Sequence, residues 1–187
     1  INKVIHYYTL AAEQNNPLAQ FNLGLIYHDG NYVKMDIKKA IHYYTLAAES
    51  NDSEAQFSLG LLYDEGEYVK RDISKAIYYY SLAADQNHCQ AQFNLGFLYN
   101  KGEYVQKDID KANHYYSLAA HQNHPQAQFN LGVIYDKGEY VPKDINKAIY
   151  YYSLAADQNH PKAQFNLAVT YDKGEYIQRN INKAIHY

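Results

Sequence analysis

The sequence has a single cysteine, Cys89, which excludes an internal disulfide framework. So few thiols suit a reducing compartment and slightly favour the cytoplasm. No apolar run approaches the roughly 18 residues of a membrane-spanning helix, so we expect no insertion into a membrane. No secretory leader is visible, but the first residues resemble the middle of a repeat, and we expect the natural chain to extend further.

An excess of positive charge is also missing. Lysine and arginine total 17 against 20 acidic residues, the net charge is −3, and no basic stripe runs along the chain. A surface for nucleic acid or for an anionic membrane is therefore not expected. The sequence contains no glycine-rich phosphate loop, no cluster of serine, histidine and aspartate, and no close carboxylate pair outside its repeats. An active site needs a convergence of different groups, so we expect neither enzyme activity nor a cofactor.

The main feature of the sequence is a repeat. The stretch AQFNLGFLY at residues 91–99 recurs with small changes every 36 residues, without insertion or deletion. Its copies lie at residues 19–27, 55–63, 127–135 and 163–171. A fixed period of this length is typical of a solenoid, in which one helical unit stacks on copies of itself. Because solenoids are rarely enzymes in their own right, the period favours a binding function.

Each period predicts two helices. In residues 1–14, Val4, Tyr7, Tyr8, Ala11 and Ala12 fall on one face of a helix with 3.6 residues per turn. The same face returns in every later copy, and we call this segment helix B. The second segment, helix A, carries the repeated stretch and is predicted over residues 17–29 and their counterparts.

Turn residues end these helices at fixed positions. Asparagine follows helix B and glycine follows helix A in every copy, and both residues tolerate the left-handed conformation that ends a helix. They are Asn15, Asn51, Asn87, Asn123 and Asn159 after helix B, and Gly30, Gly66, Gly102, Gly138 and Gly174 after helix A. Asn16 and Asp52 are expected to cap the start of helix A. Their counterparts His88, His124 and His160 are poorer caps, and a different capping arrangement is the alternative at those three junctions.

The motifs that repeat every 36 positions resemble the Sel1-like repeat family, a relative of the tetratricopeptide repeats. They are Ala-Gln-x-x-Leu-Gly-x-x-Tyr, Gly-x-x-Val-x-x-Asp, Lys-Ala and Tyr-Tyr-x-x-Ala-Ala. The resemblance covers the whole chain and implies an all-α fold, a right-handed α-solenoid of antiparallel helix pairs. It implies one array of about five repeats over residues 1–187. It also implies a scaffold that binds a protein or peptide partner and has no catalytic activity.

By the same resemblance, helix A lines the concave side of the superhelix. An apolar ladder beside a row of amides suits an extended or helical peptide, because amides pair with a main chain while pockets take side chains. The predicted partner-binding residues are Phe57, Phe93, Asn94, Phe97, Phe129, Asn130, Val133, Phe165 and Asn166. The alternative is that the phenylalanines pack between repeats and the asparagines only occupy the helix surface.

Histidine and cysteine offer weaker candidates for a site. His88, His124 and His160 are one repeat apart, or about 10 Å for neighbouring helix pairs, so they are not expected to share a metal ion. Zinc needs its ligands at about 2 Å. Cys89 lies at a predicted helix start, where the helix dipole can favour a thiolate. Its counterparts are proline or serine, so we favour an accidental free thiol.

The two ends of the sequence suggest a different function. Residues 1–7 read INKVIHY and residues 181–187 read INKAIHY. Neither end carries the polar cap that a finished solenoid needs. We interpret the chain as a window of a longer array, or as one whose ends meet other subunits. End-to-end self-association into a filament, a structural role, is therefore the alternative to the scaffold.

Overall fold

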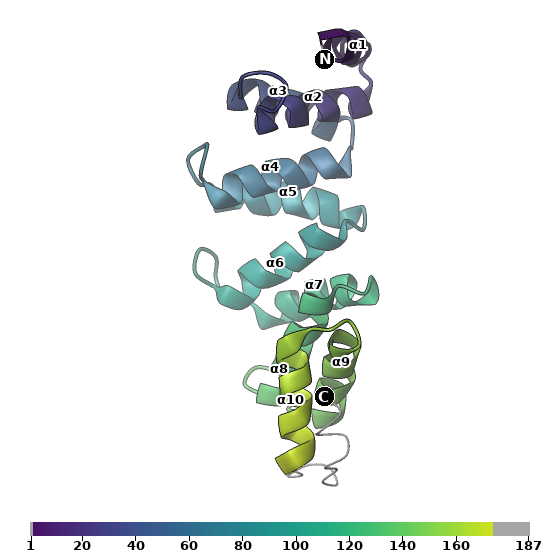
Figure 1. Cartoon of the computed structure of the whole chain (residues 1–187). Coiled ribbons are helices and arrows are strands. Elements are labelled where there is room, and N and C mark those ends of the chain that lie inside the picture. The colour runs from purple at the N-terminus through teal and green to yellow at the C-terminus, as the bar shows by residue number, and fades with distance from the viewer. Residues whose placement is uncertain (1, 174–187) are drawn as a thin grey trace. The chain divides into compact units, whose positions relative to one another are not determined.

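The computed structural model describes residues 2–173, and within this range the protein is all-α, with no strand (Figure 1). The helices are α1 (Asn2–Glu13), α2 (Pro17–Asp29), α3 (Ile37–Glu49), α4 (Ser53–Glu65), α5 (Ile73–Asp85), α6 (Cys89–Lys101), α7 (Ile109–His121), α8 (Pro125–Lys137), α9 (Ile145–Ala156) and α10 (Pro161–Lys173). Even-numbered helices occupy the predicted positions of helix A, and odd-numbered helices those of helix B. The predicted fold class, an all-α solenoid of helix pairs, is confirmed. Of the described helices, none is both long and apolar enough to cross a membrane.

The chain folds as two compact units, Ile1–Ala91 and Gln92–Tyr187, and the boundary falls inside α6. In the first unit, α2 packs against α1 and α3, and α4 packs against α3 and α5. In the second unit, α8 packs against α7 and α9, and α9 packs against α10. Contacts between helices that are neighbours in sequence are typical of stacked repeats. A single array over residues 1–187 stays a prediction; Gly174 and the second copy of the seven-residue end sequence lie outside the described residues.

The residues that end the helices adopt the predicted left-handed conformation. The glycines after helix A have φ between 66° and 69°, at Gly30, Gly66, Gly102 and Gly138. The asparagines after helix B have φ between 59° and 65°, at Asn15, Asn51, Asn87, Asn123 and Asn159. A residue with this backbone conformation cannot continue a right-handed helix, so each one fixes where its helix ends.

The N-terminal caps of helix A are also in place. Asn16 Oδ1 accepts a hydrogen bond from the N–H of Ala19 at 2.9 Å, and Asp52 Oδ1 accepts one from Ala55 at 2.8 Å. The alternative of a different cap at the histidine junctions is wrong. Nδ1 of His88, His124 and His160 accepts from the N–H of Ala91, Ala127 and Ala163, at 3.2 Å in each case. A neutral imidazole has one nitrogen that accepts hydrogen bonds, and here it does what the side-chain oxygen does in asparagine.

A tyrosine of helix B packs on a glycine of the preceding helix A. Tyr44, Tyr80, Tyr116 and Tyr152 are the largest fully buried side chains. A Cβ added to Gly24, Gly60, Gly96 or Gly132 would overlap the ring of the respective tyrosine. Helix A and helix B therefore approach each other closely at these glycines, which explains why glycine occupies the middle of a helix despite its poor helix propensity.

Candidate functional site

The predicted partner-binding residues lie on even-numbered helices and differ in exposure. Phe97 and Phe165 are the most open, at 44% and 67% exposed. The remaining residues are half-buried: Phe57, Phe93, Asn94, Phe129, Asn130, Val133 and Asn166. The rings of Phe93 and Phe97 lie one turn apart on α6, with centroids 6.4 Å apart. No ligand tests this face, so its binding role stays a prediction.

Three of these phenylalanines also connect neighbouring repeats. Each stacks on the capping histidine of the next helix A and tilts against a buried tyrosine of helix B. The stacked pairs are Phe57–His88 at 4.5 Å, Phe93–His124 at 4.5 Å and Phe129–His160 at 4.7 Å between centroids. Aromatic pairs in this range add stability beyond the area that they bury. These three rings therefore serve packing, in agreement with the alternative interpretation of the phenylalanines, and they remain half-buried.

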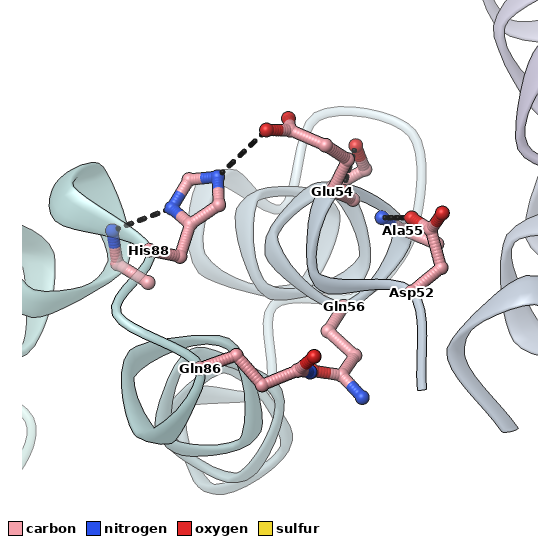
Figure 2. Close-up of polar contacts among 8 residues, drawn as sticks. Asp52, Glu54, Ala55, Gln56, Gln86 and His88 are labelled. Carbon is pink, nitrogen blue, oxygen red and sulfur yellow. Dashed lines mark hydrogen bonds and ion pairs between the residues drawn. The ribbon is translucent and has the colours of Figure 1, made fainter. Parts of the chain in front are cut away.

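The capping histidines bridge repeats through their second ring nitrogen. His88 Nε2 lies 3.4 Å from Glu54 Oε1, at the start of the preceding helix A (Figure 2). His160 Nε2 lies 3.0 Å from Gln126 Oε1 in the second unit. Each of these two rings therefore caps one helix, stacks on a phenylalanine of the previous repeat and contacts a polar side chain there. This contact between repeats was not predicted from the sequence. The 36-residue spacing of the three histidines could have indicated it.

Acid is expected to weaken the second unit through His124 and His160. Burial lowers the pKa of both imidazoles below the ordinary value, against the opposing effect of a backbone hydrogen bond. In the unfolded chain a histidine has a pKa of about 6.5, so below that pH the unfolded state binds more protons. The stability that these rings contribute is therefore complete above about pH 6.5 and is lost as the pH falls toward the lower folded pKa.

Urea denaturation at about pH 8 and about pH 5.5 measures this effect, because the two pH values lie on either side of the unfolded pKa. The matched variant replaces both histidines by asparagine, the residue that caps α2 from Asn16. We expect the loss of stability between the two pH values to be smaller in this variant than in the parent chain. An equal loss in both proteins would show that these imidazoles do not carry the pH dependence.

A row of buried glutamines forms a second set of links between repeats. Gln20, Gln56, Gln92 and Gln128 are at most 2% exposed. Within the first unit, Gln56 Nε2 donates to the carbonyl of Ala48 at 3.2 Å. Gln56 Oε1 accepts from Gln86 Nε2 at 2.7 Å (Figure 2). In the second unit the pairs Gln92–Gln122 and Gln128–Gln158 repeat the side-chain contact at 2.8 Å. The sequence signal was a constant glutamine in helix A with another glutamine 30 residues later.

The first repeat lacks one of these links. Gln20 Oε1 is buried and has no hydrogen-bond partner among the described residues, because Ser50 occupies the position of Gln86. The backbone conformation at Ser50 is nearly the same as at Gln86, with φ −85° and ψ 15° against φ −93° and ψ 18°. A glutamine at position 50 can therefore adopt the orientation that Gln86 has.

Replacing Ser50 with glutamine is expected to raise the free energy of unfolding by about 1 kcal/mol, the usual net value of a hydrogen bond that satisfies a buried acceptor. Urea denaturation followed by circular dichroism measures the change. The control is Ser50→Ala, which alters helix propensity without supplying an amide. If the alanine variant gains as much as the glutamine variant, the missing amide is not what limits this junction.

The hydroxyl groups of the buried tyrosines bond to the last turn of the preceding helix A, with one exception. Tyr44 Oη lies 3.3 Å from His28 Nδ1. Tyr80 and Tyr152 donate to Asp64 and Asp136 at 3.4 Å. In the third copy the position holds Asn100, and the hydroxyl of Tyr116 has no partner among the described residues. Burial raises the pKa of Tyr116 to about 12, so the hydroxyl keeps its proton.

A crevice of about 170 Å³ opens beside this exception, within the second unit. Its lining includes two predicted residues, Asn130 and Val133, together with Asn100. Two basic side chains, Lys107 and Lys137, are also part of the lining. Lys107 Nζ lies 3.2 Å from Tyr140 Oη and 4.4 Å from the ring centroid, and Lys137 Nζ lies 4.0 Å from Glu139 Oε1. Amide and aliphatic side chains therefore line the crevice, and both of its lysines contact other lining residues.

The weaker candidates gain no support. Within residues 2–173, no group of three histidine, cysteine or acidic side chains is arranged to hold a metal ion. Burial raises the pKa of Cys89, the opposite of what a reactive thiol needs.

The comparison with protein families fits the packing described above. The Sel1 repeat model matches residues 5–16, 17–52, 53–88, 89–124, 125–160 and 161–187. The chain belongs to the Sel1 repeat family. Counted from helix B to helix A, the links through histidine and glutamine join neighbouring helix pairs. The Sel1 segments instead begin with helix A, so each Phe–His and Gln–Gln pair lies within one Sel1 segment, and the histidine cap bonds to the start of the next. Sel1 repeat proteins are generally scaffolds for protein–protein interaction and are typically not enzymes.

Two solved Sel1 structures are close to this fold. A protective antigen of uropathogenic Escherichia coli that displays an SLR fold has a TM-score of 0.93 and 32% sequence identity over 97% of this chain. This chain spans 39% of the length of that antigen. A Sel1 repeat protein from Oxalobacter formigenes has a TM-score of 0.82 and 35% identity, with 98% of this chain and 75% of the other covered.

A third similar structure is an immunity protein from Pseudomonas aeruginosa. It has a TM-score of 0.53 and 25% identity, with 98% of this chain and 66% of that chain covered. No curated protein matches the chain.

Proposed function

We propose that this protein is an interaction scaffold that binds a partner peptide or protein through the outward face of its helix A segments. The observation that carries the proposal is the open ring of Phe97 on α6, one turn from Phe93. Phe165 on α10 is also open, because the positions that cover its counterparts Phe93 and Phe129 have no equivalent in residues 1–187. Large exposed aromatic side chains are enriched where proteins bind partners, because they bury much area at little cost in side-chain entropy. The half-buried amides Asn94 and Asn166 belong to the same two helices, and Asn130 belongs to α8.

The relatives support a protein as the partner. The family generally scaffolds protein–protein interactions, and one similar structure is an immunity protein. A peptide on this face would use the asparagine amides for its main chain and the phenylalanines for its apolar side chains.

The test is partner capture from the native cell extract with the whole chain as bait. One variant carries Phe97→Ala and Phe165→Ala, which remove open rings rather than the stacked rings of Phe93 and Phe129. The control carries Tyr78→Ala and Tyr150→Ala, which remove rings of similar exposure, 59% and 58%, from helix B. We expect a specific protein to bind the parent and the control and to lose at least about tenfold in affinity for the helix A variant, the effect of truncating one hot-spot residue.

Both variants are first checked for unchanged helicity and thermal unfolding. A photo-crosslinking residue at position 97, with position 150 as its control, then locates the contact. A partner that is retained by the helix A variant, or that crosslinks only from position 150, would exclude the helix A face.

A further inference from the structure

The crevice between α6, α7 and α8 differs in charge from the same positions of the first unit. Its charged lining consists of Lys107, Lys137 and Glu139, which leave a net charge of +1. The residues 72 positions earlier leave a net charge of −2, and they are Met35, Glu65 and Glu67. Since α8 begins and ends 72 residues after α4, the helices match, and the difference lies in the side chains.

The crevice also lacks a carboxylate that other copies carry. Asn100 lines it, and the other described copies have a titratable side chain at this position. These are His28, Asp64, Asp136 and Asp172. The crevice therefore has a neutral amide where an aspartate would repel an anion.

A relay of hydrogen bonds sets the polarity of Asn130, the second amide in the lining. His160 caps α10 through Nδ1, which accepts from the N–H of Ala163 at 3.2 Å, so the proton of the neutral ring lies on Nε2. Nε2 donates to Gln126 Oε1 at 3.0 Å, and Gln126 Nε2 donates to Asn130 Oδ1 at 3.1 Å. The oxygen of Asn130 is thereby occupied, and its nitrogen is the end that can donate to a ligand.

We propose that this crevice binds a carboxylate, the side chain of an aspartate or glutamate. Two ammonium groups and an oriented amide offer N–H donors, and a carboxylate is a pure acceptor with the opposite charge. Lys107 gives only one of its three donors to Tyr140, at 3.2 Å. Lys137 lies 4.0 Å from Glu139, the outer limit of an ion pair, and exposed pairs of this kind are weak. A carboxamide or an aliphatic side chain would bring no charge to these lysines.

The size of the crevice agrees with this ligand. A volume of about 170 Å³ equals that of about five water molecules, at about 30 Å³ each, which is room for one side chain but not for a cofactor. Ile109, Val133 and Ile134 are also in the lining and can contact the methylene groups of the side chain. We take the natural source to be an acidic side chain of the partner, and that clause rests on the proposed function.

The experiment uses a probe that needs no partner. The ¹⁵N-labelled chain is titrated with N-acetylglutamate N-methylamide, and the side-chain amide signals of Asn100 and Asn130 are followed by NMR. The same blocked derivatives of glutamine and leucine are the comparison ligands, and N-acetylleucine offers a terminal carboxylate in place of a side-chain one. We expect saturable shifts with the blocked glutamate and at least about fivefold weaker binding of the other three. Salt at about 0.5 M should remove most of this preference.

Lys107→Met with Lys137→Glu is the decisive variant, because the first unit carries methionine and glutamate at these positions. It is expected to lose at least about fivefold in affinity for the blocked glutamate. Lys101→Glu with Lys143→Met is the matched control. It makes the same two substitutions in neighbouring copies, with the same change in net charge, at residues that are not part of the lining. After both variants are checked for unchanged thermal unfolding, the control should bind within about twofold of the parent chain.

Gln126→Leu tests the relay, because leucine is the residue of the first copy at this position, Leu18. Without Gln126 the amide of Asn130 can turn over and offer its oxygen. The preference for the blocked glutamate over the blocked glutamine should fall by at least about twofold, whereas a merely structural role of Gln126 would leave it unchanged.

Three results would overturn the proposal: no saturable shift in the parent chain, equal binding of the blocked glutamine or of N-acetylleucine, or an equal loss of affinity in the two double variants. None of them bears on partner capture through Phe97 and Phe165. Conversely, loss of partner capture with intact binding of the blocked glutamate would remove the proposed function and leave the crevice as a carboxylate site.

Discussion

Replacing Gln56 with leucine is expected to lower the free energy of unfolding by about 2–3 kcal/mol, although the side chain keeps a similar size and becomes more hydrophobic. Gln56 is 1% exposed, and its Nε2 donates to the carbonyl of Ala48 at 3.2 Å and to Asn51 Oδ1 at 3.4 Å. Its Oε1 accepts from Gln86 at 2.7 Å. Leucine removes all three bonds and leaves the Ala48 carbonyl, at a buried helix end, without its side-chain donor.

The measurement is urea denaturation followed by circular dichroism, with the slope of the transition compared between variants. Gln86→Ala is the first control, because it removes one of the three bonds and leaves Gln56 Oε1 unpaired, as Gln20 Oε1 is in the first repeat, so about 1 kcal/mol should be lost. Gln14→Ala is the second, because Gln14 bonds only to the carbonyl of Leu10 on the surface, and its loss should be near zero. A Gln56→Leu chain as stable as the parent would contradict a structural role for the buried glutamines.

Gly60→Ala is expected to destabilise the protein by up to about 2 kcal/mol, against the rule that alanine is the better helix former. A Cβ at position 60 would lie 2.5 Å from Cδ1 and 2.6 Å from Cε1 of Tyr80, far inside van der Waals contact. The ring cannot move aside, because Tyr80 is fully buried and hydrogen-bonded to Asp64. Overpacking of this kind costs about 1–3 kcal/mol, and the helix gains only about 1 kcal/mol in return.

A double-mutant cycle separates the two effects. In a Tyr80→Leu background the ring is gone, so Gly60→Ala should become neutral or stabilising by up to about 1 kcal/mol. Thermal and urea denaturation of the four proteins give the coupling energy. If Gly60→Ala costs the same with and without the tyrosine ring, the close approach of α4 and α5 does not explain the glycine.

Much of this fold could be predicted because its determinants are local. The 36-residue period, the αL asparagines and the glycines after helix A each act within a few residues, and the predicted helix over residues 17–29 has the observed bounds of α2. The cap at His124 was harder to predict, because histidine is on average a weak N-cap residue. Whether it caps depends on the orientation of its ring, which here directs Nδ1 to the N–H of Ala127.

The site was less predictable because it depends on contacts between repeats. From the sequence, a glutamine in helix A looks like an ordinary polar surface residue. Only the structure shows that Gln86 Nε2 lies 2.7 Å from Gln56 Oε1, although the two residues are 30 positions apart. The sequence correctly placed the phenylalanines on helix A. Their stacking on the histidines was not predicted, because it depends on how the next repeat packs. Asn113 could have been noticed as the one asparagine in a column of isoleucines, yet only the structure shows that its oxygen is buried without a partner among the described residues.

The side-chain contacts that join neighbouring repeats are unevenly distributed in the first unit, and this determines which part of it unfolds first. The junction after α3 has Ser50 and Asp52 where the junction after α5 has Gln86 and His88, so it lacks both the amide bridge and the stacked ring. Linear arrays open where the coupling between neighbouring units is smallest. Native-state hydrogen exchange should therefore find α2 and α3 opening as a separate cooperative segment, at lower free energy than α4 and α5.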